Sequence, residues 1–322
     1  MEKKILIKLI ISFISILLVL SESHTQKIEL LPIFTIGKDT LNENEIFGYI
    51  EDLAIDSENI YILDSKMWRV QIYGKDGKYK SSIGKKGVGP GEFGYYLSCI
   101  SLDKKGNIIV GEFRRIHIFD KFGNFIRSFT VDFQFNDLCV DSEDRILILG
   151  YKKNKILHAY NIDGKYLFSF GEPLEPPSKF AYKEHPLVKI PAKVSYTKSG
   201  RVCFINPYKF EIYIYKNYLL EKKTALSNSY KPCKMLLFDR GYAKGFSLSC
   251  TYYSIFESKS LFFISLASEG KNELMVLKND KILKTLKLKD FPIEMDSEGY
   301  LYSINNSDIP YITKYSLKVS SD

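Results

Sequence analysis

The sequence predicts an all-β protein, a six-bladed β-propeller made of four-stranded antiparallel blades. Three observations predict it: a strand–turn–strand pattern recurs along the chain, each copy is followed by a second aromatic-rich hairpin, and the chain holds 23 Tyr and 22 Phe against a single Trp. Tyr, Phe and β-branched residues favour pleated, half-buried strands. Beyond the first 23 residues, no segment repeats its apolar positions with the 3.6-residue period of a helix.

The first hairpin of each repeat is clearest in EDLAIDSENIYILD (51–64), two alternating strands joined by a tight turn. Related stretches begin at residues 99, 138, 193, 253 and 293. In four of the six an Asp closes the first strand; the four are Asp56, Asp103, Asp141 and Asp296. Asp side chains close turns by bonding to nearby backbone N–H groups, so we expect turn formers here rather than a ring of metal ligands or acid–base groups.

The second hairpin of each repeat follows directly. The segments 69–84, 115–130 and 156–171 align without gaps, and 211–226 and 273–288 follow the same plan with looser turns. Each repeat therefore contributes four strands over about 50 residues, a length typical of propeller blades. We expect blades near residues 50–84, 97–130, 137–171, 191–226, 252–288 and 291–319.

The sixth repeat ends near residue 319 without an outer strand. PIFTIG (32–37) is similar to the ends of the outer strands at 84 and 171, KSSIG and LFSFG. We therefore predict that the N-terminal strand, residues 28–37, joins the last blade. This closure of the ring hides strand edges that would otherwise be exposed.

The first 23 residues have the layout of a secretory signal peptide, with lysines at 3, 4 and 8, an apolar run to Leu20, and small residues Ser21 and Ser23 before the predicted cut. The alternative is an uncleaved anchor, since the apolar run approaches spanning length. We expect cleavage, one propeller domain over 24–322, no stable membrane insertion after cleavage, and an extracytoplasmic location: periplasmic, cell-surface or secreted.

The formal net charge of +8 is small for 322 residues, and the lysines are scattered. This pattern fits a solvated surface and predicts no nucleic-acid binding. Cys99, Cys139 and Cys203 lie in apolar strand-like runs, where Cys behaves as a small hydrophobe. Cys233 and Cys250 lie in one loop region, and their pairing in an oxidising compartment stays open.

The segment DSKMWRVQIYGKDGKYKSSIGKKGVGPGEF (64–93) resembles a blade of the NHL-repeat type, which typically has an Asp, an Arg-led strand and a GPGEF link. The chain after residue 23 resembles the exported six-bladed propellers of Bacteroidetes-type bacteria. The motif is strongest in the first repeat, and GPGEF is absent from the last three. The resemblance implies a binding platform; a minority of such propellers are lyases or hydrolases that hold a metal in the central channel.

The glycine-rich stretch GKKGVGPGEFGYY (84–96) invites a phosphate-loop interpretation. No helix is predicted after it, so a phosphate site at a helix N-terminus is excluded. It is better interpreted as the link from the outer strand of one blade to the inner strand of the next.

The sequence predicts no catalytic residue, no metal and no cofactor. The four histidines are His24, His117, His158 and His185. His117 and His158 occupy equivalent positions in third strands, which indicates a repeated polar slot rather than convergence on the channel. The channel histidines of the amidating lyases have no counterpart.

The candidate ligand-binding residues lie in the loops between second and third strands, which share one face of a propeller with the links between blades. These loops form an arc of basic and aromatic residues, and His185 lies beside it in the long link 171–193. The candidates are Trp68, Arg69, Arg114, Arg115, Lys153, Tyr208, Lys209 and His185. Such groups suit an anionic or sugar-like ligand. The alternative is a solvated rim, with Arg69 and Arg115 used for packing between blades. We expect the long links 171–193 and 227–252 to cover this face.

The sequence thus favours an exported binding or interaction module, a monomer whose partner is a protein, peptide or carbohydrate-like ligand. The alternative is an enzyme at the channel mouth, a lyase or hydrolase, and a third option is a structural subunit of an envelope assembly. Carboxylates or histidines converging on the channel favour the enzyme. A basic, aromatic face without them favours binding.

Overall fold

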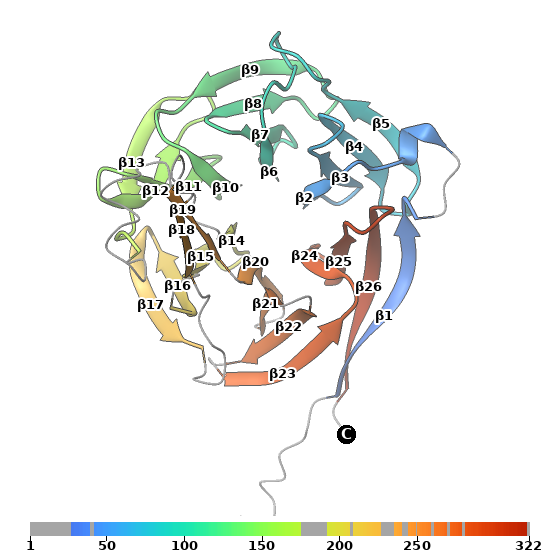
Figure 1. Ribbon diagram of the computed structural model, residues 1–322, viewed down its shortest axis with the longest axis vertical. Helices are drawn as coiled ribbons and strands as arrows, with labels where there is room; N and C mark the ends of the chain where they lie inside the picture. The colour runs from blue at the N-terminus through green and yellow to red at the C-terminus, as the bar shows by residue number, and fades with distance from the viewer. Residues whose placement is uncertain are drawn as a thin grey trace, which may run out of the picture. The chain divides into compact units, whose positions relative to one another are not determined.

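The computed structural model describes residues 27–38, 42–174, 192–206, 209–226, 235–239, 244–248, 250–258, 261–268, 271–278 and 281–320. Six four-stranded antiparallel sheets radiate from a central axis as blades (Figure 1), which confirms the predicted fold class. The blades form one compact unit, Pro32–Ser316; of the second unit, the described residues are 27–31 and 317–320. One short 3-10 helix, Glu43–Glu45, lies among the described residues, and no helix there is long and apolar enough to cross a membrane.

Each blade is given from its inner strand outward. Blade 1 is β2 (Ile50–Ile55), β3 (Asn59–Asp64), β4 (Arg69–Gly74) and β5 (Tyr79–Ile83). Blade 2 is β6 (Leu97–Leu102), β7 (Ile108–Glu112), β8 (Arg115–Phe119) and β9 (Phe125–Thr130). Blade 3 is β10 (Phe135–Val140), β11 (Ile146–Lys152), β12 (Lys155–Tyr160) and β13 (Tyr166–Phe170).

The second half of the chain repeats this order. Blade 4 is β14 (Val194–Tyr196), β15 (Arg201–Asn206), β16 (Glu211–Lys216) and β17 (Leu219–Ala225). Blade 5 is β20 (Cys250–Ser258), β21 (Leu261–Ser268), β22 (Lys271–Lys278) and β23 (Lys281–Leu288). Blade 6 is β24 (Phe291–Met295), β25 (Tyr300–Asn305) and β26 (Tyr311–Ser320), with β1 (Lys27–Ile36) outermost. The predicted closure of the ring by the N-terminal strand is therefore confirmed.

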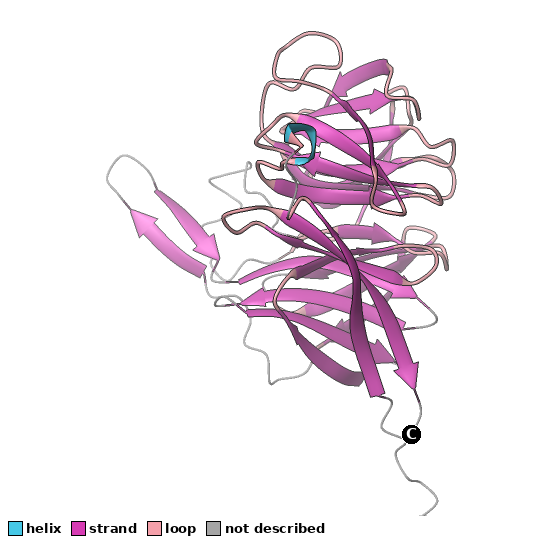
Figure 2. Cartoon of the chain, turned by 90° about the vertical axis from the view of Figure 1, so that its right-hand side faces the viewer, coloured by secondary structure: helices cyan, strands magenta, loops and turns pink. Residues whose placement is uncertain are grey.

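The link 227–252 differs from the expected loop. It contains a two-stranded antiparallel hairpin, β18 (Met235–Asp239) and β19 (Lys244–Leu248), drawn in Figure 2 as a separate pair of strands. The runs MLLFD and KGFSL are short and apolar enough for strands, and the first ends on Asp239, the residue type that closes the first strand in four blades. The hairpin belongs to no blade, so the repeat pattern did not predict it. Cys233 lies outside the described residues, so its pairing with Cys250 stays a prediction.

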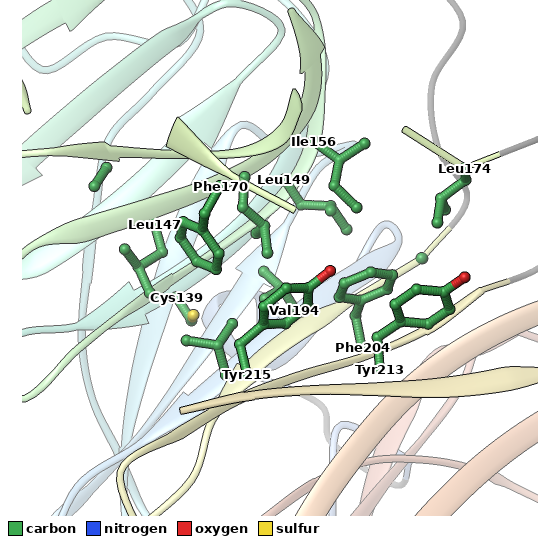
Figure 3. Close-up of a cluster of buried hydrophobic side chains, with 14 residues drawn as sticks. Cys139, Leu147, Leu149, Ile156, Phe170, Leu174, Val194, Phe204, Tyr213 and Tyr215 are labelled. Atoms are coloured by element: carbon green, nitrogen blue, oxygen red, sulfur yellow. The ribbon is translucent and has the colours of Figure 1, made fainter. Parts of the chain in front are cut away.

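The core lies between neighbouring blades. Figure 3 shows the cluster shared by blades 3 and 4, where Leu147, Leu149 and Phe170 meet Phe204 and Tyr215. Phe170 and Tyr215 pack edge to face, with ring centroids 5.4 Å apart. Each fully buried side chain of this size stabilises the fold by about 1.5–3 kcal/mol, so stability is shared among the blade interfaces. Cys99, Cys139 and Cys203 are buried, reduced members of these clusters, as expected.

The four turn Asp residues close the hairpins between first and second strands. Asp103 Oδ1 accepts from the backbone N–H groups of Lys105 (2.9 Å) and Asn107 (2.8 Å). Asp141 and Asp296 make the same pair of bonds in their own blades, and Asp56, in a turn one residue shorter, accepts from the N–H groups of Glu58 and Asn59. Their shared position is thus explained by local backbone bonding.

The stretch GKKGVGPGEFGYY links β5 to β6. Phe93 is fully buried and packs against Phe119 and His117 of blade 2, with ring centroids 5.9 and 5.1 Å away. Gly84, at φ +81°, lets the chain turn over this ring, because a Cβ there would lie 2.2 Å from it. Phe93 therefore anchors the link between blades 1 and 2.

Candidate functional site

The blades present two faces. At one, which we call the link face, the links between blades meet the loops between second and third strands: Ser65 donates its N–H to Tyr49 O (3.0 Å), and Phe113 donates to Tyr96 O (3.1 Å). At the other, the turn face, lie the turns closed by Asp56, Asp103, Asp141 and Asp296. The loops and links thus share one face, as predicted.

Two clusters of cationic and aromatic side chains lie on the link face. Lys86 Nζ lies 4.5 Å from the centre of the Trp68 ring. In blade 2, the Arg114 guanidinium lies 5.3 Å from the Phe113 ring, which also stacks on Tyr95 at 5.8 Å. Trp68 and Phe113 both adopt positive φ, 52° and 47°, so the same left-handed turn residue presents each ring.

The remaining predicted residues divide into three groups. Arg69 is largely buried: its guanidinium donates to Ile46 O at 2.6 Å and lies 3.9 Å from the Asp64 carboxylate, so it ties the preceding link to blade 1. Arg115 is half-buried, and Lys153 and Lys209 are exposed on their loops. Tyr208 and His185 lie outside the described residues. None of the six described candidates lines the channel cavities described next.

The link-face mouth of the central channel holds a cavity of about 380 Å³. Its polar lining comes from several blades and consists of Tyr49, Glu51, Ser98, Asn136, Lys193, Asn272, Asn305 and Asn306. Asn306 holds the chain at Ile50, because its side-chain amide accepts from Ile50 N–H and donates to Ile50 O at 2.9 and 2.8 Å. Asn136 Oδ1 is buried and has no hydrogen-bond partner among the described residues. An unpaired buried acceptor therefore belongs to a residue that lines the cavity.

A second cavity, of about 330 Å³, opens on the turn face and is lined by the inner strands of all six blades. Sequence reasoning missed its charged residues: Asp52 on β2, Asp137 on β10, Lys193 just before β14 and Glu294 on β24. A signal did exist. Asp52, Asp137 and Lys193 each stand four residues before the residue that closes the inner strand, an unusual place for a charge in an apolar strand.

β-Bulges aim these side chains. In blades 1, 2, 3, 5 and 6 the register shifts by one residue near the start of the inner strand, and the residue after the shift is Asp52, Cys99, Asp137, Ser254 and Glu294, respectively. Such a bulge bends a strand and re-aims the next side chain. Asp52 accepts from Ile100 N–H at 3.0 Å and Asp137 from Val194 N–H at 2.7 Å, so each carboxylate also binds the inner strand of the following blade.

An ion pair crosses the channel. The Lys193 ammonium of blade 4 bonds to the Asp52 carboxylate of blade 1, which lies on the opposite side of the ring (Figure 1). Lys193 lines both cavities. The pair thus lies where the two cavities meet.

The charges of this region are strongly perturbed. Burial raises the pKa of Asp137 to about 7, against the opposing effect of Lys193. Burial likewise raises the pKa of Glu294 to about 7. Burial alone would lower the pKa of Lys193, but Asp52 and Asp137 outweigh it and raise that pKa, so the ammonium stays charged.

The two third-strand histidines occupy the same slot with different partners. His117 Nε2 lies 2.6 Å from Glu112 Oε2, and both side chains are buried. Glu112 also accepts from the N–H groups of Gly94 and Tyr95, fixing the end of the GPGEF link. His158 instead bonds to Gly150 O (3.0 Å) and Ser169 Oγ (2.8 Å). In the described part of the chain no three His, Cys, Asp or Glu residues are grouped to hold a metal.

This geometry defines a class: a six-bladed propeller with a polar, divided central channel. The family model DUF5128, described as "6-bladed beta-propeller", matches residues 22–314, and the chain belongs to this family. The resemblance inferred from the sequence is thereby confirmed.

Other similar proteins share the fold. A Bacteroides fragilis protein described as exported superposes with a TM-score of 0.62 at 11% identity, covering 93% of this chain and 96% of its own. Virginiamycin B lyase of Staphylococcus aureus, in an inactive form with quinupristin, gives a TM-score of 0.55 at 12% identity, covering 91% of this chain and 100% of its own. Protein brain tumor of Drosophila melanogaster is 27% identical over 125 residues, which is 37% of this chain and only 12% of that protein.

Proposed function

We propose that this protein is an exported ligand-binding module whose site is the link-face mouth of the central channel. The observation that carries the proposal is the 380 Å³ cavity there, which lies within the usual size range of small-molecule pockets and has a polar lining drawn from several blades, Asn136 included. The apolar stretch at 1–23 and the exported structural neighbour support a location outside the cytoplasm.

The lining favours a carbohydrate-like or short peptide ligand. Amide, hydroxyl and carboxylate oxygens suit ligands rich in O–H and N–H donors, and Tyr49, which is 46% exposed, offers a ring face at the rim. The Trp68–Lys86 and Arg114–Phe113 clusters lie on the same face and extend the contact surface for a longer ligand.

Titration calorimetry against panels of oligosaccharides and short peptides tests this proposal. We expect saturable binding that weakens at least tenfold in Asn136→Ala and Tyr49→Ala. The exposed Phe122, on the β8–β9 turn, gives the matched control Phe122→Ala, which should leave affinity unchanged. Binding that is indifferent to Asn136 and Tyr49 would refute the channel-mouth site. Binding indifferent to Arg114→Ala and Lys153→Ala would remove the basic arc from it.

One observation favours the alternative, an enzyme of the channel. Asp137 and Glu294 are carboxyls whose pKa values, raised to about 7, suit general acid–base chemistry near neutral pH. Incubation with quinupristin and with the ligands found above, followed by mass spectrometry, separates the two functions. Conversion that is lost in Asp137→Asn supports the enzyme; saturable binding without conversion supports the module.

A further inference from the structure

The turn-face cavity has an unbalanced set of charges. Five carboxylates and two lysines line it: Asp52, Asp137, Glu257, Glu294, Asp296, Lys193 and Lys198. Most have partners. Asp296 pairs with Lys75, Asp52 pairs with Lys193, and Lys198 donates to Ser297 O at 2.9 Å. Glu257 accepts from Ser199 Oγ at 2.6 Å and lies 4.0 Å from Arg201.

Asp137 and Glu294 make no ion pair with any described residue, and the nearby Lys193 ammonium, which also attracts Asp137, is already bonded to Asp52. Asp137 lines the cavity and is only 4% exposed, and its carboxylate accepts hydrogen bonds from backbone N–H groups alone, those of Val194 and Leu138. Glu294 accepts only from the N–H of its neighbour Met295, at 2.9 Å. Within the described residues, no side chain donates to either carboxylate. Buried carboxylates are normally paired with a positive charge, so the cavity lacks a counter-ion.

We propose that the turn-face cavity binds a primary ammonium or guanidinium group, with Asp137 and Glu294 as its counter-ions. The two carboxylates come from blades 3 and 6, on opposite sides of the ring, so a cation on the axis would lie between them (Figure 1). A volume of about 330 Å³ is at the small end of ligand pockets and fits a short alkylamine or one Lys or Arg side chain. The Asp52–Lys193 pair bounds the cavity on the side of the link-face site, so this site is separate from the one proposed above.

The site should depend on pH. Asp137 and Glu294 titrate near pH 7 while facing Asp52, Lys193, Lys198, Glu257 and Asp296 across the cavity. Only their ionised forms attract a cation, whereas an alkylamine stays protonated up to about pH 10. For one carboxyl with a pKa of about 7, the competent fraction rises about tenfold between pH 6 and pH 8, and the apparent affinity rises with it.

Titration calorimetry with the native protein provides the test. The probes are n-butylammonium, N-acetyl-lysine methylamide and, as the uncharged match, n-butanol. We expect saturable binding of both amines, about tenfold tighter at pH 8 than at pH 6, with proton release, and none of butanol. Tighter binding of the lysine derivative than of butylammonium identifies a peptide side chain as the ligand, and equal binding identifies a free amine. Lack of saturable binding by either amine at pH 8 overturns the proposal.

Isosteric variants assign the site. Asp137→Asn and Glu294→Gln keep side-chain shape and remove the charge, so each should weaken amine binding at least tenfold and abolish the pH dependence. Asp163→Asn, an exposed carboxylate on an outer turn, is the matched control and should leave binding unchanged. Amine binding that persists in the Asp137→Asn, Glu294→Gln double variant refutes the site. Oligosaccharide or peptide binding at the link face should survive in that variant, which separates failure of this inference from failure of the proposed function.

Discussion

Replacing Phe93 by Ala tests how the GPGEF link holds blades 1 and 2 together. Phe93 is fully buried, and its ring fills the space between Gly84, His117 and Phe119. Removing a buried Phe ring costs about 3–5 kcal/mol when the surrounding structure cannot collapse. Here the walls belong to two blades and a backbone turn, so we expect the upper half of that range.

The measurement is denaturant unfolding at pH 7 followed by intrinsic fluorescence, with Tyr96→Ala as control. Tyr96 lies three residues away in the same link and is 81% exposed, so its loss should change the unfolding free energy by less than about 0.5 kcal/mol. A double-mutant cycle sharpens the test. Gly84→Ala alone forces a Cβ into the Phe93 ring, whereas in the Phe93→Ala background only the strain of φ +81° remains.

We therefore expect Gly84→Ala to cost about 1 kcal/mol without the ring and at least 2 kcal/mol with it. The coupling between the two positions should thus be 1 kcal/mol or more in favour of the double variant. A cost below 1 kcal/mol for Phe93→Ala, or additive effects in the cycle, would refute the anchoring role of Phe93.

Three further outcomes follow from the contacts. Arg69→Ala should destabilise the fold by about 1–3 kcal/mol, because Ile46 O loses a charged hydrogen-bond donor. Arg114 is exposed, so Arg114→Ala should change the unfolding free energy by less than about 0.5 kcal/mol. Equal shifts of the two variants in thermal unfolding would contradict this. Asp141→Ala should cost about 1–3 kcal/mol through its lost turn bonds, and an unchanged melting temperature would argue against the turn role. At Glu112, hydrogen bonds from His117 and backbone N–H groups outweigh burial and lower the pKa of the carboxyl group. The contribution of Glu112 to folding stability is therefore present above about pH 4.5 and is lost as the pH falls through the lower pKa of the folded state. In a plot of unfolding free energy against pH, Glu112→Gln should flatten the acid limb.

The fold was predictable because each blade solves the same local problems with the same residues. The turn at 56–59 needs a side chain that accepts backbone N–H groups, and Asp103, Asp141 and Asp296 repeat that solution. Closure by the N-terminal strand was predictable from the missing outer strand of the last blade. The hairpin β18–β19 was not predicted, since it belongs to no four-stranded repeat, although its first strand also ends on an Asp, Asp239.

The channel was harder to predict, because the chain gives no local sign of which strand residues converge across the ring. Asp52 and Lys193 are 141 residues apart, and only the ring geometry brings them into contact. The loop residues attracted attention because Arg, Lys and Trp stand out in short polar segments. Arg69 shows the weakness of that criterion, because its guanidinium holds a link to the core of the blade.

A comparison of two positions within the repeats suggests where this chain differs from a generic propeller. The residue that closes the inner strand is Asp in four of six blades, as its backbone bonding requires. The residue four positions earlier is Asp52, Cys99, Asp137 and Lys193 in blades 1 to 4. No local backbone requirement explains so varied a set, because the same strand geometry accepts all four. The choice is instead explained across the ring, where Lys193 bonds to Asp52 and no side chain of the described residues pairs with Asp137. By this reasoning, a ligand specific to this protein is recognised at these positions near the start of the inner strands, where the residues of the blades differ most.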